Sequence, residues 1–400
     1  MQTILSRLVS LLNIRDLTDL ASSLISIESH RDTPQRERVC AEKIADIFLQ
    51  WGMQPEIVNV IGDRSNVYCR LKGSGGGKSL ILNGHIDTVP AYDMDIPPFQ
   101  PYVENGMLYG RGSVDMKGAL ACMMTALRLL RDLRVPLKGD VIFTAVINEE
   151  DRSEGTEHLI LHGPHADRCV VGEPTGLQIM AGHRGLEWLQ FEFIGKAAHG
   201  GTPDQGVNAI SMAAHFIQRV EEQLIPRLAQ RIHPLIGPAV MNFGVIQGGT
   251  QPSSVADRCI VQVDRRWLPQ ENLDQVLGEY RIILDDLANE DQNFRCVMTR
   301  MDSNMATMDH RPMEISLDDP LVTGLQAILP RLGIEPKISA FGGWTDASLI
   351  SNYAHIPCVV FGPGDLSVAH SRCEYVPVED LRTCTLAYAL LAADICNQEK

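Results

Sequence analysis

The sequence predicts an α/β protein in two parts: a domain with a mixed, mainly parallel sheet flanked by helices, and a smaller α+β sandwich inserted into it. The length of 400 residues exceeds that of one ordinary domain. Several short apolar runs have the composition of strands buried on both faces, which is typical of parallel sheets. The middle segment, about 181–300, instead shows the order strand, helix, strand, strand, helix, which favours an antiparallel sheet with helices.

The first of these strands is predicted at Ser79–Asn83, a short apolar run that follows a glycine-rich turn. Gly84 ends the run, and His85 and Asp87 follow at its carboxyl end, where open α/β sheets place their sites. In an extended His-x-Asp segment the two side chains lie on the same side. The imidazole can therefore bind a metal ion while the carboxylate orients the ring.

A glycine-rich turn at 109–112 precedes Asp115, which stands at the start of a helical pattern over Met116–Leu133. A carboxylate at this position is held by the turn before it and can bridge two cations. The alternative is that Asp115 only caps the helix.

A further strand, Asp140–Ile147, ends in an acidic run that contains Glu149 and Glu150. Adjacent carboxylates repel one another and are costly unless a positive charge lies nearby. Neighbouring side chains point in different directions, so one glutamate can bind a metal ion while the other faces a water molecule as a base. The alternative is a solvated acidic loop.

The same pattern recurs at two more predicted strands. Cys169–Val171 is followed by Glu173, and Cys358–Phe361 is followed at some distance by His370. Two imidazoles and three carboxylates suit two zinc-like ions that share one carboxylate, about 3.5–4 Å apart. The candidate ligands are His85, Asp115, Glu150, Glu173 and His370.

Two other patterns favour structure over chemistry. The segment Lys72–Ser79 is similar to a phosphate-binding loop, but the first glycine of that motif would fall on Lys72, so a hairpin turn is expected. His158 and His162 are four residues apart without the metalloprotease order of His and Glu, and they are expected at the end of a surface helix.

Composition excludes several classes of partner. A net charge of −15 argues against nucleic acid and against an anionic membrane surface. No convincing signal peptide is present, and no apolar run approaches the length of a membrane span. The ten cysteines are scattered without a C-x-x-C pair, which predicts reduced thiols in a cytoplasmic protein.

Together these motifs resemble the co-catalytic zinc hydrolases that include aminoacylase, acetylornithine deacetylase, succinyl-diaminopimelate desuccinylase and glutamate carboxypeptidase. The resemblance extends from Asn83 to Leu381. It implies two divalent ions, with zinc as the default and cobalt or manganese as alternatives. It assigns His85 and Glu173 to one ion, Glu150 and His370 to the other, Asp115 to the bridge, Asp87 to orienting His85, and Glu149 to the general base.

The resemblance also implies that 181–300 is a lid and dimerisation domain between the two parts, 1–180 and 301–400, of a discontinuous catalytic domain in a homodimer. The chain departs from the family at Ser253, where asparagine is common, which puts substrate contacts of that loop in doubt. The implied roles are oxyanion stabilisation for His199, binding of a substrate carboxylate for Arg266, and further substrate contacts for Asn242, Gly343 and Thr345.

The expected reaction is hydrolysis of the amide bond of an N-acyl amino acid or a similar small amide that carries a carboxylate. A metal-activated water would attack the carbonyl, with Glu149 as general base. The closest alternative is a dipeptidase or carboxypeptidase on the same scaffold. A binding protein without activity is a different class, and it would be expected to lack one of these residues.

Overall fold

The computed structural model describes residues 3–305 and 307–400. The chain divides into two compact units, Met1–Gly182 with Met313–Lys400 (the first unit) and His183–Pro312 (the second unit). The inserted segment was expected at 181–300, whereas the second unit continues to residue 312. It does so because the chain hydrogen-bonds back to the first long strand of this unit, from Met301 N to Trp188 O (3.0 Å) and from Leu186 N to His310 O (2.9 Å).

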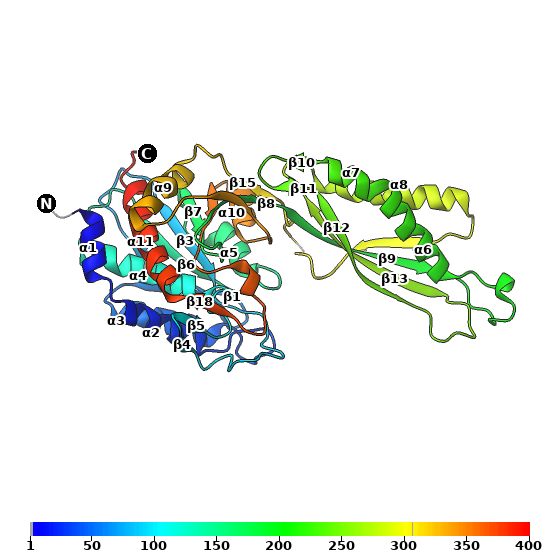
Figure 1. Cartoon of the computed structure of the whole chain (residues 1–400), viewed down its shortest axis with the longest axis horizontal. Coiled ribbons are helices and arrows are strands. Elements are labelled where there is room, and N and C mark those ends of the chain that lie inside the picture. The colour runs from blue at the N-terminus through cyan, green and yellow to red at the C-terminus, as the bar shows by residue number, and fades with distance from the viewer. Residues whose placement is uncertain (1–2, 306) are drawn as a thin grey trace. The chain divides into compact units, whose positions relative to one another are not determined.

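The first unit is built on a nine-stranded mixed sheet in the order β1-β2-β6-β3-β7-β17-β8-β15, with β16 paired to β8 (Figure 1). A separate three-stranded sheet has the order β18-β5-β4. The strands are β1 (Pro55–Ile61), β2 (Arg64–Leu71), β3 (Leu80–His85), β4 (Tyr102–Glu104), β5 (Met107–Tyr109), β6 (Val141–Val146), β7 (Arg168–Val171), β8 (Ile179–His183), β15 (Met313–Glu314), β16 (Ile338–Phe341), β17 (Cys358–Val360) and β18 (Tyr375–Pro377).

The centre of the large sheet is parallel. Strand β3 pairs in parallel with β6 and β7, and β17 pairs in parallel with β7, while β2 and β8 are antiparallel to their neighbours β6 and β17. Every residue of β3, β6 and β17 is buried, as their apolar composition predicts. The carboxyl ends of β3, β6 and β7 therefore meet at one edge of the sheet.

Helices cover both faces of this sheet. On one face, Phe48 of α3 packs against Phe143 of β6, and Met116 and Leu120 at the start of α4 lie against Gly84. On the other face, α5 and α10 contribute Leu159 and Ile350 to one apolar core with the strands. The helices are α1 (Ile4–Leu11), α2 (Ile14–Ile25), α3 (Arg38–Gln50), α4 (Lys117–Asp132), α5 (Glu154–His162), α9 (Pro320–Ile328), α10 (Ala347–Tyr353) and α11 (Val378–Ile395), with short turns η3 (Leu329–Leu332) and η4 (Leu366–Val368).

The turn between β2 and β3 corrects one expectation. A hairpin was expected at Lys72–Ser79, but β6 lies between β2 and β3 in the sheet. The glycine-rich segment crosses to a strand beyond its neighbour and hydrogen-bonds outside itself, for example from Gly75 N to Lys138 O (2.7 Å). Its composition indicates a turn, but it does not show that β2 pairs with β6, since Leu71 at the end of β2 lies opposite Val141.

The second unit has a four-stranded antiparallel sheet in the order β12-β13-β9-β14. Strand β13 alternates strictly between buried and partly exposed residues, so one face of the sheet packs against helices and the other does not. Its elements are β9 (Gly185–Ile194), β10 (Ile232–His233), β11 (Gly237–Pro238), β12 (Val240–Gly248), β13 (Arg258–Trp267), β14 (Cys296–Arg300), α6 (Ala209–Arg219), α7 (Ile225–Gln230) and α8 (Leu273–Glu290), with η1 (Pro203–Gln205) and η2 (Val220–Leu224).

These observations confirm the expected fold class, a mixed α/β unit joined to an α+β unit. Among the described residues, no helix has both the length and the apolar character that crossing a membrane requires.

Candidate metal centre

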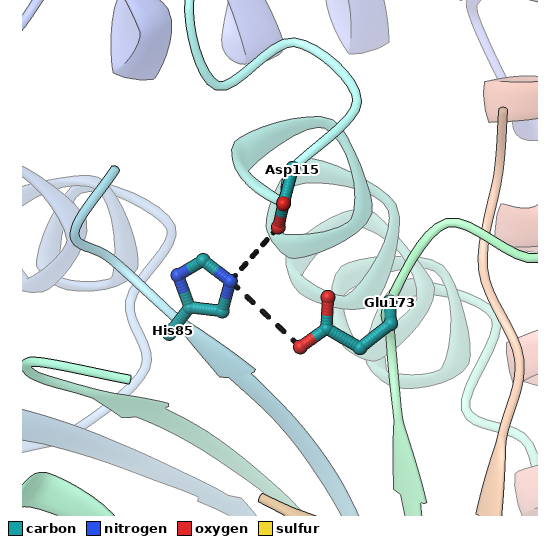
Figure 2. A group of neighbouring side chains, drawn as sticks. All are labelled: His85, Asp115 and Glu173. Carbon is teal, nitrogen blue, oxygen red and sulfur yellow. Dashed lines mark hydrogen bonds and ion pairs between the residues drawn. The ribbon is translucent and has the colours of Figure 1, made fainter. Parts of the chain in front are cut away.

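The carboxyl edge of the parallel strands brings one group of possible metal ligands together. His85 is the last residue of β3, and Glu173 follows β7 by two residues. Figure 2 shows the imidazole of His85 directed between the carboxylates of Asp115 and Glu173. His85 Nε2 lies 3.0 Å from Asp115 Oδ1 and 3.8 Å from Glu173 Oε1. All three residues are buried.

A second group shares Asp115 with the first. His370 Nε2 lies 3.1 Å from Asp115 Oδ2 and 3.2 Å from Glu150 Oε1. In each group the candidate ligand atoms lie within 4.8 Å of one another. The two oxygens of Asp115 thus face different histidines, which is the geometry of a bridging carboxylate. The structure brings together all five residues that the sequence predicted as ligands.

The meeting of Asp115 and His370, which are far apart in the sequence, depends on the small sheet. Strand β18 pairs with β5, with Tyr375 opposite Tyr109. Asp115 follows β5 by six residues, and His370 precedes β18 by five. Asp115 does not cap α4, because the cap position is Met116 and no side chain caps that helix.

Asp87 holds the site together in two ways. His85 Nδ1 lies 3.0 Å from the backbone carbonyl oxygen of Asp87 and 3.6 Å from its carboxylate Oδ1. The carboxylate itself accepts hydrogen bonds from the backbone N–H groups of Glu149 (3.1 Å) and Glu150 (3.0 Å). The sequence predicted that the Asp87 carboxylate orients the His85 ring, whereas the shorter contact of the ring is with the Asp87 backbone oxygen. The contact of the carboxylate with the backbone of Glu149 and Glu150, which links the ends of β3 and β6, was not predicted.

Burial and crowding shift the pKa values of the acids in this cluster. Burial, with the charge of Glu173 beside it, raises the pKa of Glu149 well above the usual value for glutamate. Burial, with the charge of Asp115, likewise raises the pKa of Glu173 and of Glu150. The negative charge is therefore in excess at this edge of the sheet.

The histidines compensate for part of that excess. Burial by itself lowers the pKa of His85, but its hydrogen bonds to Asp115 and Asp87 raise that pKa well above the usual value. Hydrogen bonds to Asp115 and Glu150 raise the pKa of His370 to about 10.

This donor set fits divalent cations. Each proton shared by an imidazole and a carboxylate stands where a metal ion can bind both groups, and metal binding releases such protons. Within the described residues, the buried Oε1 of Glu173 accepts no hydrogen bond, so it has a lone pair available for a ligand. Nitrogen and oxygen donors of this kind are typical of zinc, cobalt and manganese sites.

One acidic residue near the site was missed by the sequence reasoning. Asp346, at the start of α10, is buried, and its Oδ2 accepts a hydrogen bond from Thr156 Oγ1 (2.5 Å). Burial raises the pKa of Asp346 to about 6, and its charge acts on the carboxyls of Glu149 and Glu173. The only signal in the sequence was its position after the glycine-rich segment 342–343.

The two substrate-contact candidates that precede Asp346, Gly343 and Thr345, lie in different environments. Gly343 is partly exposed, whereas Thr345 is fully buried, and its hydroxyl accepts a hydrogen bond from the backbone N–H of Ala347 (3.3 Å). Thr345 thus helps to start α10. Contacts of Gly343 and Thr345 with a substrate stay a prediction.

The remaining candidates belong to the second unit. Arg266 and Asp264 lie on the partly exposed side of β13, and Arg266 donates two hydrogen bonds to Asp264, from Nε (2.8 Å) and Nη2 (3.0 Å). Asn242 of β12 is opposite Asp264 in the register. Asn242, Asp264 and Arg266 therefore share the face that the helices leave uncovered, and Arg266 keeps donors for a further partner.

His199 lies in an exposed turn of the second unit. Its Nδ1 accepts a hydrogen bond from the backbone N–H of Gly201 (3.0 Å), so the neutral ring carries its proton on Nε2. The turn pairs with the serine segment at 253–254, through Gly200 N to Ser253 O (2.8 Å) and a bridge between His199 and Ser254. The serine segment thus supports the His199 turn through its backbone.

An α/β scaffold whose parallel strands collect such donors beside another half-buried glutamate is typical of metal-dependent hydrolases. The family model that matches this chain, over residues 81–394, is Peptidase family M20/M25/M40. The chain belongs to this family, and it is a hydrolase of amide bonds.

Relatives of known name agree with this assignment. The chain is 29% identical over 412 residues to N-formyl-4-amino-5-aminomethyl-2-methylpyrimidine deformylase of Bacillus subtilis, which covers 96% of each chain. It is 30% identical over 339 residues to acetylornithine deacetylase of Myxococcus xanthus, covering 84% of this chain and 85% of the relative. A tripeptidase from Staphylococcus aureus has the same fold, with a TM-score of 0.80 at 22% identity, covering 97% of this chain and 100% of the tripeptidase.

Proposed function

We propose that this protein removes a small acyl group from the nitrogen of a compound that carries a carboxylate, such as an N-acyl amino acid. The observation that carries the proposal is the pair of ligand groups that share Asp115, with Glu149 beside them. The naming of two relatives as a deformylase and a deacetylase supports a short acyl group.

The proposed cofactor is a pair of divalent ions, with zinc as the default and cobalt or manganese as alternatives. His85 and Glu173 would hold one ion, Glu150 and His370 the other, and Asp115 both. When bound, such a pair lowers the pKa of a water molecule and polarises the carbonyl oxygen of the substrate.

The proposed general base is Glu149. Its carboxyl lies among the charges of Glu173, His85 and Asp346, and its backbone N–H is fixed by Asp87. Glu149 would take a proton from the attacking water and deliver it to the departing amide nitrogen, which gives a carboxylic acid and an amine. Asp87 would fix the positions of His85 and Glu149 relative to each other, because it contacts both.

The second unit would supply the substrate contacts. His199 carries its proton on Nε2, so this nitrogen can donate a hydrogen bond to the developing oxyanion. The guanidinium of Arg266 suits a carboxylate, with Asn242 on the same face. Gly343 and Thr345, in the first unit, are proposed to shape the pocket.

We also propose that the protein is a cytoplasmic homodimer. Its ten cysteines are all free, which suits a reducing compartment. Strand β12 lies at the edge of its sheet and exposes Val240, Val245 and Ile246, and such an edge can pair with a second copy.

The test is hydrolysis of a panel by zinc-loaded and chelator-stripped protein, with metal content measured alongside. The panel holds N-formyl, N-acetyl and N-succinyl amino acids and several dipeptides. We expect metal-dependent cleavage of one acyl class. Preference for dipeptides would replace the proposal with a peptidase, and a protein that binds no metal would overturn the site.

A further inference from the structure

A buried ion pair outside the ligand set, Arg111–Glu374, contacts the backbone at Asp115 and the backbone next to His370. Glu374 is fully buried. Its Oε1 accepts hydrogen bonds from the backbone N–H groups of Val114 (3.0 Å) and Asp115 (3.1 Å), and its own backbone oxygen accepts one from Gly110 N (3.1 Å). One residue thus fixes three points of the segment that presents Asp115.

Arg111 completes the arrangement from the other side. It is 2% exposed, and its Nη1 donates to Glu374 Oε2 at 2.5 Å. Its Nη2 lies 3.3 Å from the backbone oxygen of Ser371, which directly follows His370. Arg111 is therefore bonded at once to the residue that fixes Asp115 and to the backbone beside His370.

Glu374 is placed to orient other groups and not to bind an ion itself. Both of its oxygens already accept hydrogen bonds, one from two backbone N–H groups and the other from a guanidinium. It also belongs to neither of the two groups of candidate ligands found among the described residues.

The backbone at His370 needs such support. His370 has a φ of +57°, in the left-handed region that non-glycine residues adopt at a cost. Its side chain is about half exposed, whereas His85 is 1% exposed, so less packing holds it. An anchor on the next peptide group restricts both the backbone and the ring.

We propose that the Arg111–Glu374 pair positions Asp115 and His370 relative to each other, and thereby sets the affinity of the site made by Asp115, Glu150 and His370 for a divalent ion. The two residues act through the ligands, so they are positioning residues. The inference rests on the metal centre of the proposed function.

The test is zinc binding by the full chain, measured by competition with a chromophoric chelator. The variants are Glu374→Gln, which keeps the shape but not the charge, and Arg111→Lys, which keeps the charge but not the two-pronged geometry. The double variant Arg111→Gln/Glu374→Gln removes both buried charges together and leaves neither unpaired, so it tests the pair even where a single variant fails to fold. Arg168→Lys is the matched control, because Arg168 makes a largely buried pair with Asp319 (2.9 Å) at the amino end of β7.

We expect the three variants at Arg111 and Glu374 to bind one of two zinc equivalents about 10- to 100-fold more weakly, as is usual when a partner of a metal ligand is lost. In the double variant, which leaves no buried charge unpaired, the melting temperature of the metal-free protein should change no more than in the control. Excess zinc should restore kcat.

Unchanged zinc affinity in folded variants would overturn the inference. So would a loss of affinity that the control shares, or one that in the double variant follows a lower melting temperature of the metal-free protein, because the pair would then be structural only. Failure of the wild-type chain to bind zinc would instead count against the proposed function, so the two failures are distinguishable.

Discussion

Two clusters of charged residues, one in each unit, bury charge in opposite ways. In the second unit, Arg265 of β13 is fully buried, and it binds Glu271 at 2.5 Å. Arg231 also binds Glu271, at 2.8 Å, and both arginines pair with Glu279. Two guanidinium groups thus face two carboxylates, and the network is neutral.

The cluster at the carboxyl edge of the first unit's sheet collects carboxylates around imidazoles, and the pKa values of Glu149, Glu150 and Glu173 are raised by burial and by the charges of neighbouring carboxylates. An excess of buried charge is unfavourable unless a counterion binds. The comparison teaches that balance distinguishes the two clusters. In a neutral network each buried charge is paired within the fold. A surplus of buried negative charge instead favours the binding of a cation.

The largest expected effect separates function from stability in the first unit. Glu149→Gln should lower kcat by about 10²- to 10⁴-fold, because a general base is lost. It should not lower the melting temperature, since it removes one of several mutually repelling carboxyls. Metal content should be unchanged, and steady-state kinetics, elemental analysis and calorimetry check the three parts.

A variant that keeps its turnover would remove Glu149 from the mechanism. A variant that loses both turnover and metal would show that Glu149 is a metal ligand. That result would contradict its assignment as a general base that does not bind the metal.

The neutral network of the second unit should respond in the opposite way. Arg265→Met leaves buried carboxylates with one arginine fewer, and breaking a buried pair costs about 3–5 kcal/mol of unfolding free energy. The neighbouring Arg266→Lys, on the partly exposed side of β13, should change it by about 0.5 kcal/mol or less. Hydrogen-exchange protection of peptides from 183–312 measures both, and equal effects would contradict the comparison.

The smallest effect concerns a buried imidazole of the second unit. Burial and the charge of Arg300 lower the pKa of His310 to about 4, whereas carboxylates raise that of His85 in the first unit. The unfolded chain therefore binds a proton at His310 that the folded chain does not, and stability falls as the pH drops from 6.5 towards 4. Between pH 7 and 5 the loss should be about 2 kcal/mol.

The pH dependence is measured by hydrogen-exchange protection of the second unit at the two pH values. His310→Gln should remove most of it, and His215→Gln, at an exposed position of α6, is the control. Equal pH dependence in wild type and His310→Gln would show that His310 does not titrate in this range.

Much of the candidate metal centre could be predicted, because three of the five candidate ligands follow a local rule. His85 and Glu173 come at or just after the ends of buried strands, and parallel strands share one carboxyl edge, so apolar runs already imply proximity. Glu150 follows the same rule after β6. The fold class was predictable for the same reason, since the spacing of apolar residues along the sequence indicates which residues are buried.

The contacts that hold those ligands could not be predicted. That Asp87 binds the backbone of Glu149 and Glu150, and that Glu374 binds that of Asp115, depends on hydrogen bonds between segments far apart in the chain. Any carboxylate can make such a bond, so residue type alone does not name the partner. The burial of Thr345 just before α10 could not be predicted either, because it also depends on packing between distant segments.

The sequence by itself determined the fold class, the parallel strands at the centre of the large sheet and the set of candidate ligands, because the periodicity of apolar residues and the chemistry of side chains are local properties. Only the tertiary structure decided that β6 separates β2 from β3, and that β5 and β18 bring Asp115 to His370. It also decided that the two oxygens of Asp115 face different histidines. Pairing between distant strands is chosen by the packing of the whole sheet, and no short segment contains that information.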